Sequence, residues 1–139
     1  METKTILVVD DDIENARSYC EILTDLNYRC ITGGDVNAAL AMLQSETVDL
    51  VITDYRMPGK TGLDFIVALR QICPDLPAIM ITAYGNIETY LRSMSLGAFE
   101  FVNKPVKKEE FERIVRHALN RNNGEIIKGE DDHEQYSYR

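Results

Sequence analysis

Short apolar runs alternate with segments of helical periodicity along most of this chain, and this alternation limits the folds open to it. Runs with strand character occupy residues 5–9, 28–32, 49–53, 78–82 and 99–102. The first, third and fourth runs are continuously hydrophobic, as expected of strands that helices cover on both faces. Between the runs, apolar residues recur at the spacing of amphipathic helices, most clearly at 111–119. The sequence therefore predicts an α/β fold of five β-α units with a parallel sheet between two helical layers.

Capping residues precede several of the expected helices. Asp12, Asp35 and Asn86 fit the N-cap position, and Thr61 with Asp64 fits the pattern of a capping box. These side chains accept hydrogen bonds from the first free backbone amides of a helix, so they predict where the helices begin.

Length and charge restrict the classes of function. The 139 residues suit one domain, which we place at 1–121, followed by a polar, acidic C-terminal tail at 122–139. With 15 Lys and Arg against 23 Asp and Glu, the net charge is −8. This balance argues against direct nucleic-acid binding and against an anionic membrane surface, both of which favour basic patches. Within the tail, Ile126 and Ile127 are the residues we expect to add a short ordered turn.

Features of the chain favour a cytoplasmic location. Acidic residues directly follow the first apolar run, unlike a secretory signal, and no apolar stretch approaches the roughly 20 residues of a membrane span. Cys20, Cys30 and Cys73 are odd in number and their spacing fits neither a zinc site nor a CxxC motif. Each lies among apolar residues, so we expect three buried, reduced thiols.

Polar side chains follow four of the five expected strands. Asp10 and Asp11 follow the first strand, Asp54 follows the third, Thr82 ends the fourth and Lys104 follows the fifth. Ligands of open α/β sheets bind beyond the carboxyl ends of the strands, so we expect these side chains to share one rim.

Their chemistry is that of a phosphoryl-transfer site. Two carboxylates ~4 Å apart repel by about 4 kcal/mol at an effective dielectric constant near 20, and a divalent cation would relieve this. All-oxygen ligands favour Mg²⁺, with Mn²⁺ as an alternative. The Lys104 ammonium and the Thr82 hydroxyl would then neutralise and bind phosphoryl oxygens while a carboxylate attacks. Singly, each residue has an ordinary explanation, such as a helix cap, a solvated turn or a surface charge; their convergence favours the site.

Four stretches closely resemble response-regulator receiver domains of two-component systems. They are residues 6–11 (ILVVDD), 51–59 (VITDYRMPG), 79–83 (IMITA) and 97–105 (GAFEFVNKP). The resemblance covers roughly residues 4–121. The residues in these stretches are most similar to those of receivers of AAA+ activators of the alternative sigma factor. It implies a flavodoxin-like (βα)5 fold with strand order 2-1-3-4-5.

The resemblance also implies roles for the rim residues. Asp54 is similar to the phosphoacceptor, Asp11 to a direct metal ligand, and Asp10 to an acid that holds the ion largely through water. The backbone carbonyl of Arg56 would complete the metal ligands. Lys104 matches the family's catalytic lysine, and the bond that follows it, to Pro105, is expected to be cis.

The family's switch implies a conformational consequence of phosphorylation. Thr82 is similar to the hydroxyl that moves onto the phosphoryl group, beside the small Ala83. Phe101 matches the aromatic residue that then turns inward, although an aromatic on an edge strand is as often simple packing. The change would alter the face formed by the helix at 87–96, the strand at 99–102 and the helix at 111–119.

Partners follow from the same resemblance. A sensor histidine kinase or a phosphotransfer protein would supply the phosphoryl group, docking near the helix that begins at residue 13. The output would be an unknown protein or domain, and a homodimer through the switching face is a further expectation. Tyr90 and Leu91 are apolar in a segment expected to be exposed, so they are candidates for a partner surface.

Two bulky side chains depart from receivers with small residues at the rim. Arg56 and Tyr84 lie two positions beyond Asp54 and Thr82, where they would obstruct attacking water. We therefore expect slow loss of the phosphoryl group from the phosphorylated form.

Two other functions remain open. A phosphatase of the haloacid dehalogenase type would use a similar set, here Asp10, Asp12, Thr82 and Lys104. Against it, Glu14 stands where that family has Thr or Val, no second acidic motif follows within the fold, a cap domain is missing and Asp54 would have no role. The other alternative is a pseudo-receiver that is never phosphorylated. The presence of all three acids, Asp10, Asp11 and Asp54, argues against it.

Overall fold

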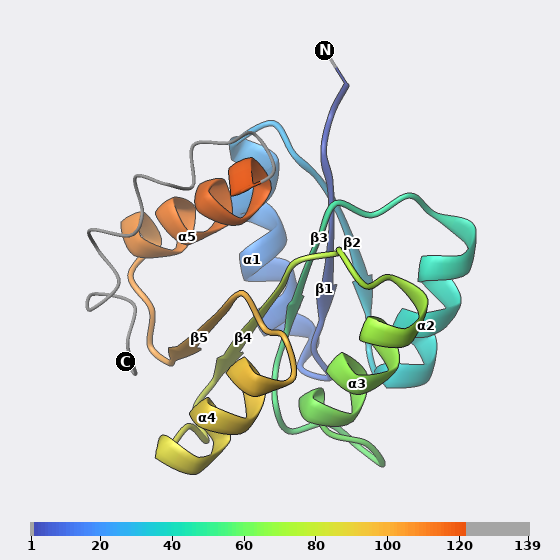
Figure 1. The fold of residues 1–139 in the computed structure, drawn as a ribbon. Helices are drawn as coiled ribbons and strands as arrows, with labels where there is room; N and C mark the ends of the chain where they lie inside the picture. The colour runs from blue at the N-terminus through green and yellow to red at the C-terminus, as the bar shows by residue number, and fades with distance from the viewer. Residues whose placement is uncertain (1, 122–139) are drawn as a thin grey trace.

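The computed structural model describes residues 2–121 and contains alternating strands and helices (Figure 1). The strands are β1 Thr5–Val9, β2 Arg29–Gly33, β3 Leu50–Thr53, β4 Ala78–Thr82 and β5 Glu100–Asn103. The helices are α1 Ile13–Asp25, α2 Val36–Ser45, α3 Gly62–Ile72, α4 Ile87–Ser95 and α5 Lys108–Asn120. The predicted alternation of strands and helices is therefore confirmed.

The five strands form one parallel sheet in the order β2-β1-β3-β4-β5. Helices α1 and α5 cover one face, and α2, α3 and α4 cover the other (Figure 1). This is the flavodoxin-like arrangement predicted above. Because β1 and β3 lie in the middle, the chain reverses direction across the sheet between them, which is where such folds bind ligands.

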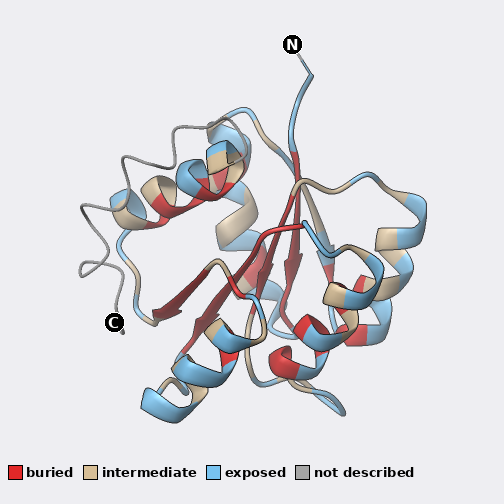
Figure 2. Ribbon diagram, viewed as in Figure 1, coloured by how far each residue is buried: buried red, intermediate tan, exposed pale blue. Residues whose placement is uncertain are grey.

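Alternate residues of each central strand supply two hydrophobic cores. Leu7 and Val9 pack towards α2 and α3, whereas Ile6 and Val8 pack towards α1 and α5. All four side chains are at most 1% exposed, and the central strands are buried along their length (Figure 2). Burial on both faces explains why these strands are continuously apolar in sequence.

The predicted capping residues begin their helices. Asp12 accepts hydrogen bonds from the amides of Glu14 and Asn15 at the start of α1. Thr61 and Asp64 form a reciprocal capping box at α3. Asp35 caps α2 and Asn86 caps α4 in the same way. These caps satisfy backbone donors at the helix ends that face the functional rim.

The second strand begins one residue later than the sequence pattern suggested. The amide of Tyr28 donates to the carbonyl of Leu23 at 3.0 Å, which closes the end of α1 rather than joining the sheet. The turn places Asn27 at φ 71°, a conformation that asparagine tolerates better than most residues. Strand pairing therefore starts at Arg29.

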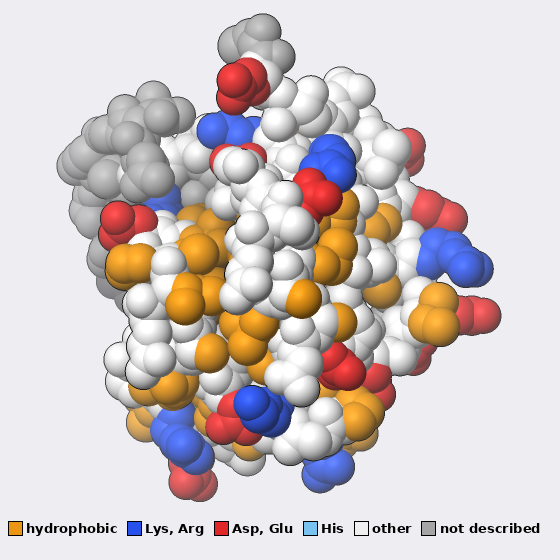
Figure 3. All heavy atoms as spheres, turned by 90° about the vertical axis from the view of Figure 1, so that its right-hand side faces the viewer, with side chains coloured by type: hydrophobic (Ala, Val, Ile, Leu, Met, Phe, Trp, Pro, Cys, Tyr) orange, Lys and Arg blue, Asp and Glu red, His pale blue; other side chains and the backbone are white. Residues whose placement is uncertain are grey.

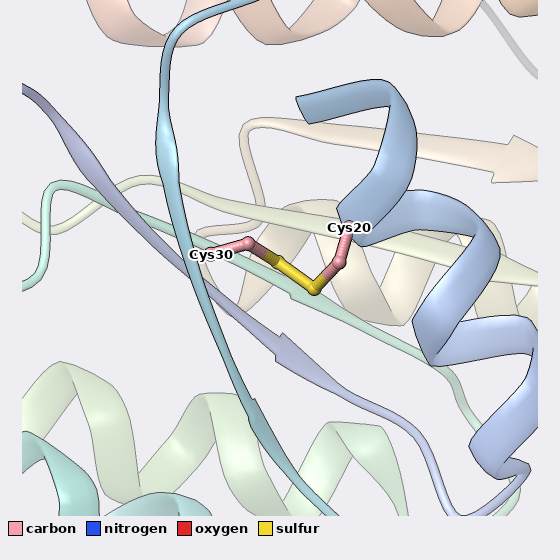
Figure 4. Close-up of a disulfide and its surroundings, with 2 residues drawn as sticks. All are labelled: Cys20 and Cys30. Atoms are coloured by element: carbon pink, nitrogen blue, oxygen red, sulfur yellow. A yellow bond between two sulfur atoms is a disulfide. The ribbon is translucent and has the colours of Figure 1, made fainter. Parts of the chain in front are cut away.

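The prediction of three buried, reduced thiols was wrong: two of the cysteines are oxidised, and none of the three is fully buried. Cys20 on α1 and Cys30 on β2 form a disulfide, with a Cα–Cα distance of 5.5 Å (Figure 4). Packing of α1 against the neighbouring strand brings the two side chains within the range for such a bond. Both residues are half-buried rather than fully buried. Cys73 is a free thiol, as expected, and it too is only half-buried.

Two further expectations concern membrane-spanning helices and the C-terminal tail. Among residues 2–121, no helix combines the length and apolar character that a bilayer span requires. The tail at 122–139, including the turn expected at Ile126 and Ile127, lies outside the described residues.

An exposed apolar surface occurs on α3, where Val67 is 43% and Ile72 is 52% exposed. Hydrophobic side chains gather on this side of the molecule (Figure 3).

Candidate functional site

The carboxyl ends of four strands deliver polar side chains to one edge of the sheet. β1 leads into Asp10, β3 into Asp54 and β5 into Lys104, while Thr82 is the last residue of β4. Because all the strands are parallel, these ends lie at the same edge. The electrostatic environment of Asp10 includes both Asp54 and Lys104, so the predicted residues do converge.

Asp54 and Lys104 form the centre of this rim. The Lys104 Nζ lies 3.0 Å from Oδ2 of Asp54, and the two side chains are only 20% and 10% exposed respectively. The other carboxylate oxygen, Oδ1, accepts a hydrogen bond from the Tyr55 amide at 2.6 Å. The Lys104 amide donates to the Thr82 carbonyl at 2.9 Å, and the bond from Lys104 to Pro105 is cis, as predicted. Asp54 is thus held through both oxygens.

Asp10 is the most buried acid of the rim, at 5% exposure. Its amide donates to the Gly33 carbonyl at 3.0 Å, and its Oδ1 accepts from the Asp12 amide at 2.9 Å. Burial raises the pKa of Asp10, the Asp12 amide and Lys104 oppose the rise, and Asp54 and Asp11 add to it. Neighbouring carboxylates thus disfavour the charge on Asp10, as the sequence argument anticipated.

The field of these acids extends to α1. The hydroxyl of Tyr19 has its pKa raised to about 12, first by burial and then by the charges of Asp10 and Asp54. The Tyr19 ring stacks on Phe111 of α5, with the ring centres 5.1 Å apart. The helix that begins at the acidic loop is therefore coupled to the site electrostatically as well as through the chain.

The oxygen-rich rim fits a divalent cation of the magnesium type. Asp10, Asp11 and Asp54 supply carboxylates, and the raised pKa of Asp10 is what an added positive charge would reverse. Within residues 2–121, however, no three His, Cys, Asp or Glu side chains are grouped so as to hold a metal ion by themselves. Magnesium commonly binds through one or two carboxylates and retains several waters, so the donor set suits that mode.

Thr82 is fully buried at the end of β4. Its Oγ1 accepts a hydrogen bond from the Tyr84 amide at 3.1 Å. A hydroxyl that accepts in this way still has its own hydrogen to donate. The Thr82 hydroxyl is thus connected to the loop that leads into α4, which begins at Ile87.

The two bulky rim residues identified in the sequence contact each other. The guanidinium carbon of Arg56 lies 4.5 Å from the centre of the Tyr84 ring, the geometry of a cation–π interaction. Arg56 follows β3 and Tyr84 follows β4, and both are exposed. The contact therefore joins the two loops that flank Asp54, which the sequence could not show.

Phe101 is fully buried on β5 and packs edge-on against Tyr90 of α4, with the ring centres 5.8 Å apart. The inward placement that the resemblance associates with switching is thus the placement seen here. Of the two candidate partner residues, Tyr90 is half-buried and Leu91 is 58% exposed. Ile87, at 65% exposure, lies on the same helix.

Sequence reasoning missed Gly85 in the loop between β4 and α4. A Cβ at this position would lie 2.8 Å from Cε1 of Phe101 and would also collide with the side chain of Asn103. Only glycine lets the loop approach β5 this closely. A glycine in a loop is too common to single out without the structure.

The geometry disfavours the phosphatase alternative. That reading needs Asp12 as a catalytic acid, but its carboxylate is used to cap α1 through the amides of Glu14 and Asn15. It also leaves Asp54 without a role, although Asp54 is the acid that pairs with Lys104.

Comparison with known proteins points the same way. The response regulator receiver domain family matches residues 6–116. The chain is 35% identical to the response regulator protein PilR of Pseudomonas aeruginosa over 126 residues, and 34% identical to the DNA-binding transcriptional regulator NtrC of Azospirillum brasilense over 122 residues. These alignments cover 90% and 88% of this chain, but only 28% and 25% of the two relatives.

A solved structure adds a match in three dimensions. The beryllofluoride-activated receiver domain dimer of NtrC4 superposes with a TM-score of 0.82 at 29% identity, covering 86% of this chain and 98% of that one. From its sheet order, its rim and these relatives, the chain belongs to the receiver domain family of two-component response regulators.

Proposed function

We propose that this receiver domain accepts a phosphoryl group on Asp54 from the phosphohistidine of a sensor kinase or phosphotransfer protein. The observation that carries the proposal is the 3.0 Å contact of Lys104 Nζ with Asp54 Oδ2, in a half-buried rim that also contains Asp10. A carboxylate beside a fixed ammonium is ready to take on the charge of a phosphoryl group. In the step, a bond forms between Asp54 oxygen and phosphorus while the bond from phosphorus to the histidine nitrogen breaks.

The residues around Asp54 have separate tasks in this proposal. The Tyr55 amide holds Oδ1 of Asp54 and Lys104 holds Oδ2, so the carboxylate is fixed in place for attack. Lys104 neutralises the phosphoryl oxygens as they approach, and the buried Thr82 hydroxyl donates to one of them. Asp10, Asp11, Asp54 and the carbonyl of Arg56 would hold Mg²⁺, or Mn²⁺ in its place. That ion supplies charge neutralisation and in-line orientation.

Phosphorylation would be transmitted through Thr82. When its hydroxyl turns towards a phosphoryl oxygen, it gives up the hydrogen bond from the Tyr84 amide, which lies in the loop before α4. We infer that the face of α4, β5 and α5 then changes its population of conformations and controls an output partner or domain. The activated NtrC4 receiver is a dimer, which supports a homodimer of this chain. Exposed Ile87 and Leu91 offer apolar surface for it on the face that we propose.

The test is direct phosphorylation of the full chain by a small phosphodonor such as acetyl phosphate, with and without Mg²⁺. Intact-mass analysis is expected to show one added phosphoryl group that requires Mg²⁺, and peptide mapping should place it on Asp54. Asp54→Asn should abolish the addition. Asp25→Asn, an exposed acid at the C-terminal end of α1, is the matched control and should leave it unchanged.

Two results would reject the proposal. Addition to the Asp54→Asn variant at the native rate would mean that another residue is the acceptor. Repeated turnover of phosphomonoesters would favour a phosphatase. Beryllofluoride with Mg²⁺ gives an independent measurement, because it should shift the NMR resonances of Thr82 and Phe101 in a working receiver and leave a pseudo-receiver unchanged.

A further inference from the structure

We propose that the Cys20–Cys30 pair is a reversible redox modification site that controls how firmly α1 is held on β2, and through this how readily Asp54 is phosphorylated. The second part rests on the proposed function; the first does not. The disulfide joins the middle of α1 to the second residue of β2, an edge strand of the sheet (Figure 4).

Both joined elements lead directly to Asp10. At the far end of β2, the Gly33 carbonyl accepts from the Asp10 amide at 3.0 Å. At the start of α1, the Asp12 amide holds the Asp10 carboxylate at 2.9 Å while the Asp12 side chain caps the helix. The backbone of Asp10 therefore depends on β2, and its side chain depends on α1. The disulfide fixes these two supports relative to each other.

Besides the disulfide, α1 has an apolar contact with the sheet. Of its 13 residues, Ala16 and Leu23 are buried, and Tyr19, Cys20 and Ile22 are partly buried against the same core. The Tyr19 ring stacks on Phe111, which ties the helix to α5 but not to β2. The disulfide adds a covalent link to the apolar contact between α1 and the edge strand, and its reduction leaves that contact without the link.

The site is accessible from the surface. Cys20 lines a shallow depression of about 440 Å³ together with Arg17, Glu21, Thr24 and Asp25. Cys30 is half-buried on the edge strand. A thiolate attacks a disulfide sulfur directly, so access to one of the two sulfurs is what exchange requires. Disulfides that form in compartments where thiols are kept reduced are usually catalytic or redox-sensing.

The chemistry is a dithiol–disulfide exchange. A dithiol reductant attacks one sulfur of the pair and forms a mixed disulfide, and its second thiol then releases the other cysteine. The bond between Cys20 and Cys30 breaks, each sulfur takes a proton from the reductant, and the reductant leaves with its own disulfide. Two electrons pass to the protein, and oxidation by a disulfide of the same class reverses the step.

The experiment compares the full chain in its oxidised and reduced forms. Thiol titration should count one free thiol in the oxidised protein, from Cys73, and three after treatment with a dithiol. Amide hydrogen exchange should become severalfold faster in α1 and β2 on reduction, while the amides of α3 stay unchanged. Phosphorylation by acetyl phosphate should be severalfold slower in the reduced form.

Two variants make the comparison specific. Cys73→Ser removes the free thiol and should keep both redox responses. Cys20→Ser with Cys30→Ser should behave as the reduced protein under all conditions; if this variant does not fold, the chemically reduced native chain takes its place. Exchange rates that are equal in the two redox forms would overturn the proposal, as would three free thiols after treatment with a disulfide oxidant. If neither form is phosphorylated but α1 and β2 still respond in the exchange measurement, the proposed function fails and the redox site stands.

Discussion

At the scale of single residues, the rim contains more negative than positive charge. Asp54 and Asp11 both act on buried Asp10, and Lys104 is the cation that opposes them there. Lys104 pairs with Asp54, so Asp10 relies on a backbone amide for compensation. Functional sites commonly keep such unfavourable charge because the chemistry needs it, at a cost in stability.

Asp10→Asn is therefore expected to stabilise the cation-free protein at neutral pH by about 1 kcal/mol, because it removes a buried charge. The pKa of Asp10 in the folded protein lies above 3.8, its value when exposed. The folded state thus binds this proton more tightly than the unfolded state does. The destabilisation by the charged Asp10 carboxylate is therefore fully present at pH values above the folded pKa. It disappears as the pH falls through that pKa towards 3.8. Urea unfolding of both proteins at several pH values measures the difference.

Glu21→Gln provides the control for this measurement, because it removes an exposed acid on α1 and is expected to change the free energy of unfolding by less than about 0.5 kcal/mol. An Asp10→Asn protein that is no more stable than the native chain at pH 7 would contradict the charge argument.

The Arg56–Tyr84 contact concerns the lifetime of the phosphorylated form. Both side chains lie over loops that flank Asp54, and the cation–π geometry holds them together. Tyr84→Ala and Arg56→Ala should each shorten the lifetime severalfold, because water then reaches the aspartyl phosphate more easily. Tyr84→Phe keeps the ring and should retain the native lifetime. The decay is followed by intact-mass analysis after the phosphodonor is removed, and equal lifetimes in all four proteins would reject the idea.

At the scale of elements, local sequence signals predicted what local physics controls. The strands at 5–9 and 78–82 were predicted with their observed bounds, and the caps Asp12, Asp35 and Asn86 begin their helices as expected. Apolar periodicity and capping chemistry act over a few residues, so a sequence displays them openly. The rim could be predicted as well, because parallel strands bring their carboxyl ends together whatever the details of packing.

The sequence could not predict features that depend on how elements pack. The Cys20–Cys30 disulfide requires α1 to lie over β2 at a particular rotation, which cysteine spacing does not encode. The place of Gly85 against Phe101 depends on the path of a loop over a neighbouring strand. The Arg56–Tyr84 contact likewise joins two loops that only the sheet brings together. All three are features of the tertiary structure, and each depends on contacts between segments that are distant in the sequence.

Of the five helices in residues 2–121, α4 has the fewest buried residues. Its buried residue is Ser93, whose hydroxyl has no hydrogen-bond partner among residues 2–121. A buried polar atom without a partner costs free energy, and alanine also favours a helix more than serine does. Ser93→Ala should therefore raise the free energy of unfolding by about 1 kcal/mol, measured by urea denaturation.

Ser95 on the same helix separates the two contributions. It is exposed and its Oγ donates to the Arg92 carbonyl at 3.0 Å, so Ser95→Ala changes helix propensity without removing a buried unpaired group. The stabilisation by Ser93→Ala should exceed that of Ser95→Ala. Equal effects of the two substitutions would show that the buried hydroxyl carries no penalty.

At the scale of the whole molecule, residues 2–121 contain the rim and both hydrophobic cores described above. The rim draws on four strand ends between Asp10 and Lys104, and the last helix, α5, covers the α1 side of the sheet. Phe111, Ile114 and Val115 of α5 are at most 2% exposed. The receiver family matches residues 6–116, so the boundary that we place after residue 121 remains a prediction.

A chain that ends at residue 121 should therefore fold and accept phosphate like the full chain, with a free energy of unfolding within about 0.5 kcal/mol of it. A chain that ends at residue 107 loses α5 and uncovers one hydrophobic core, so it should lose its cooperative unfolding transition. Urea denaturation followed by circular dichroism measures both, and acetyl phosphate labelling checks the site. A loss of more than about 2 kcal/mol on removing 122–139 would exceed what a solvated tail can contribute and would place those residues within the folded unit.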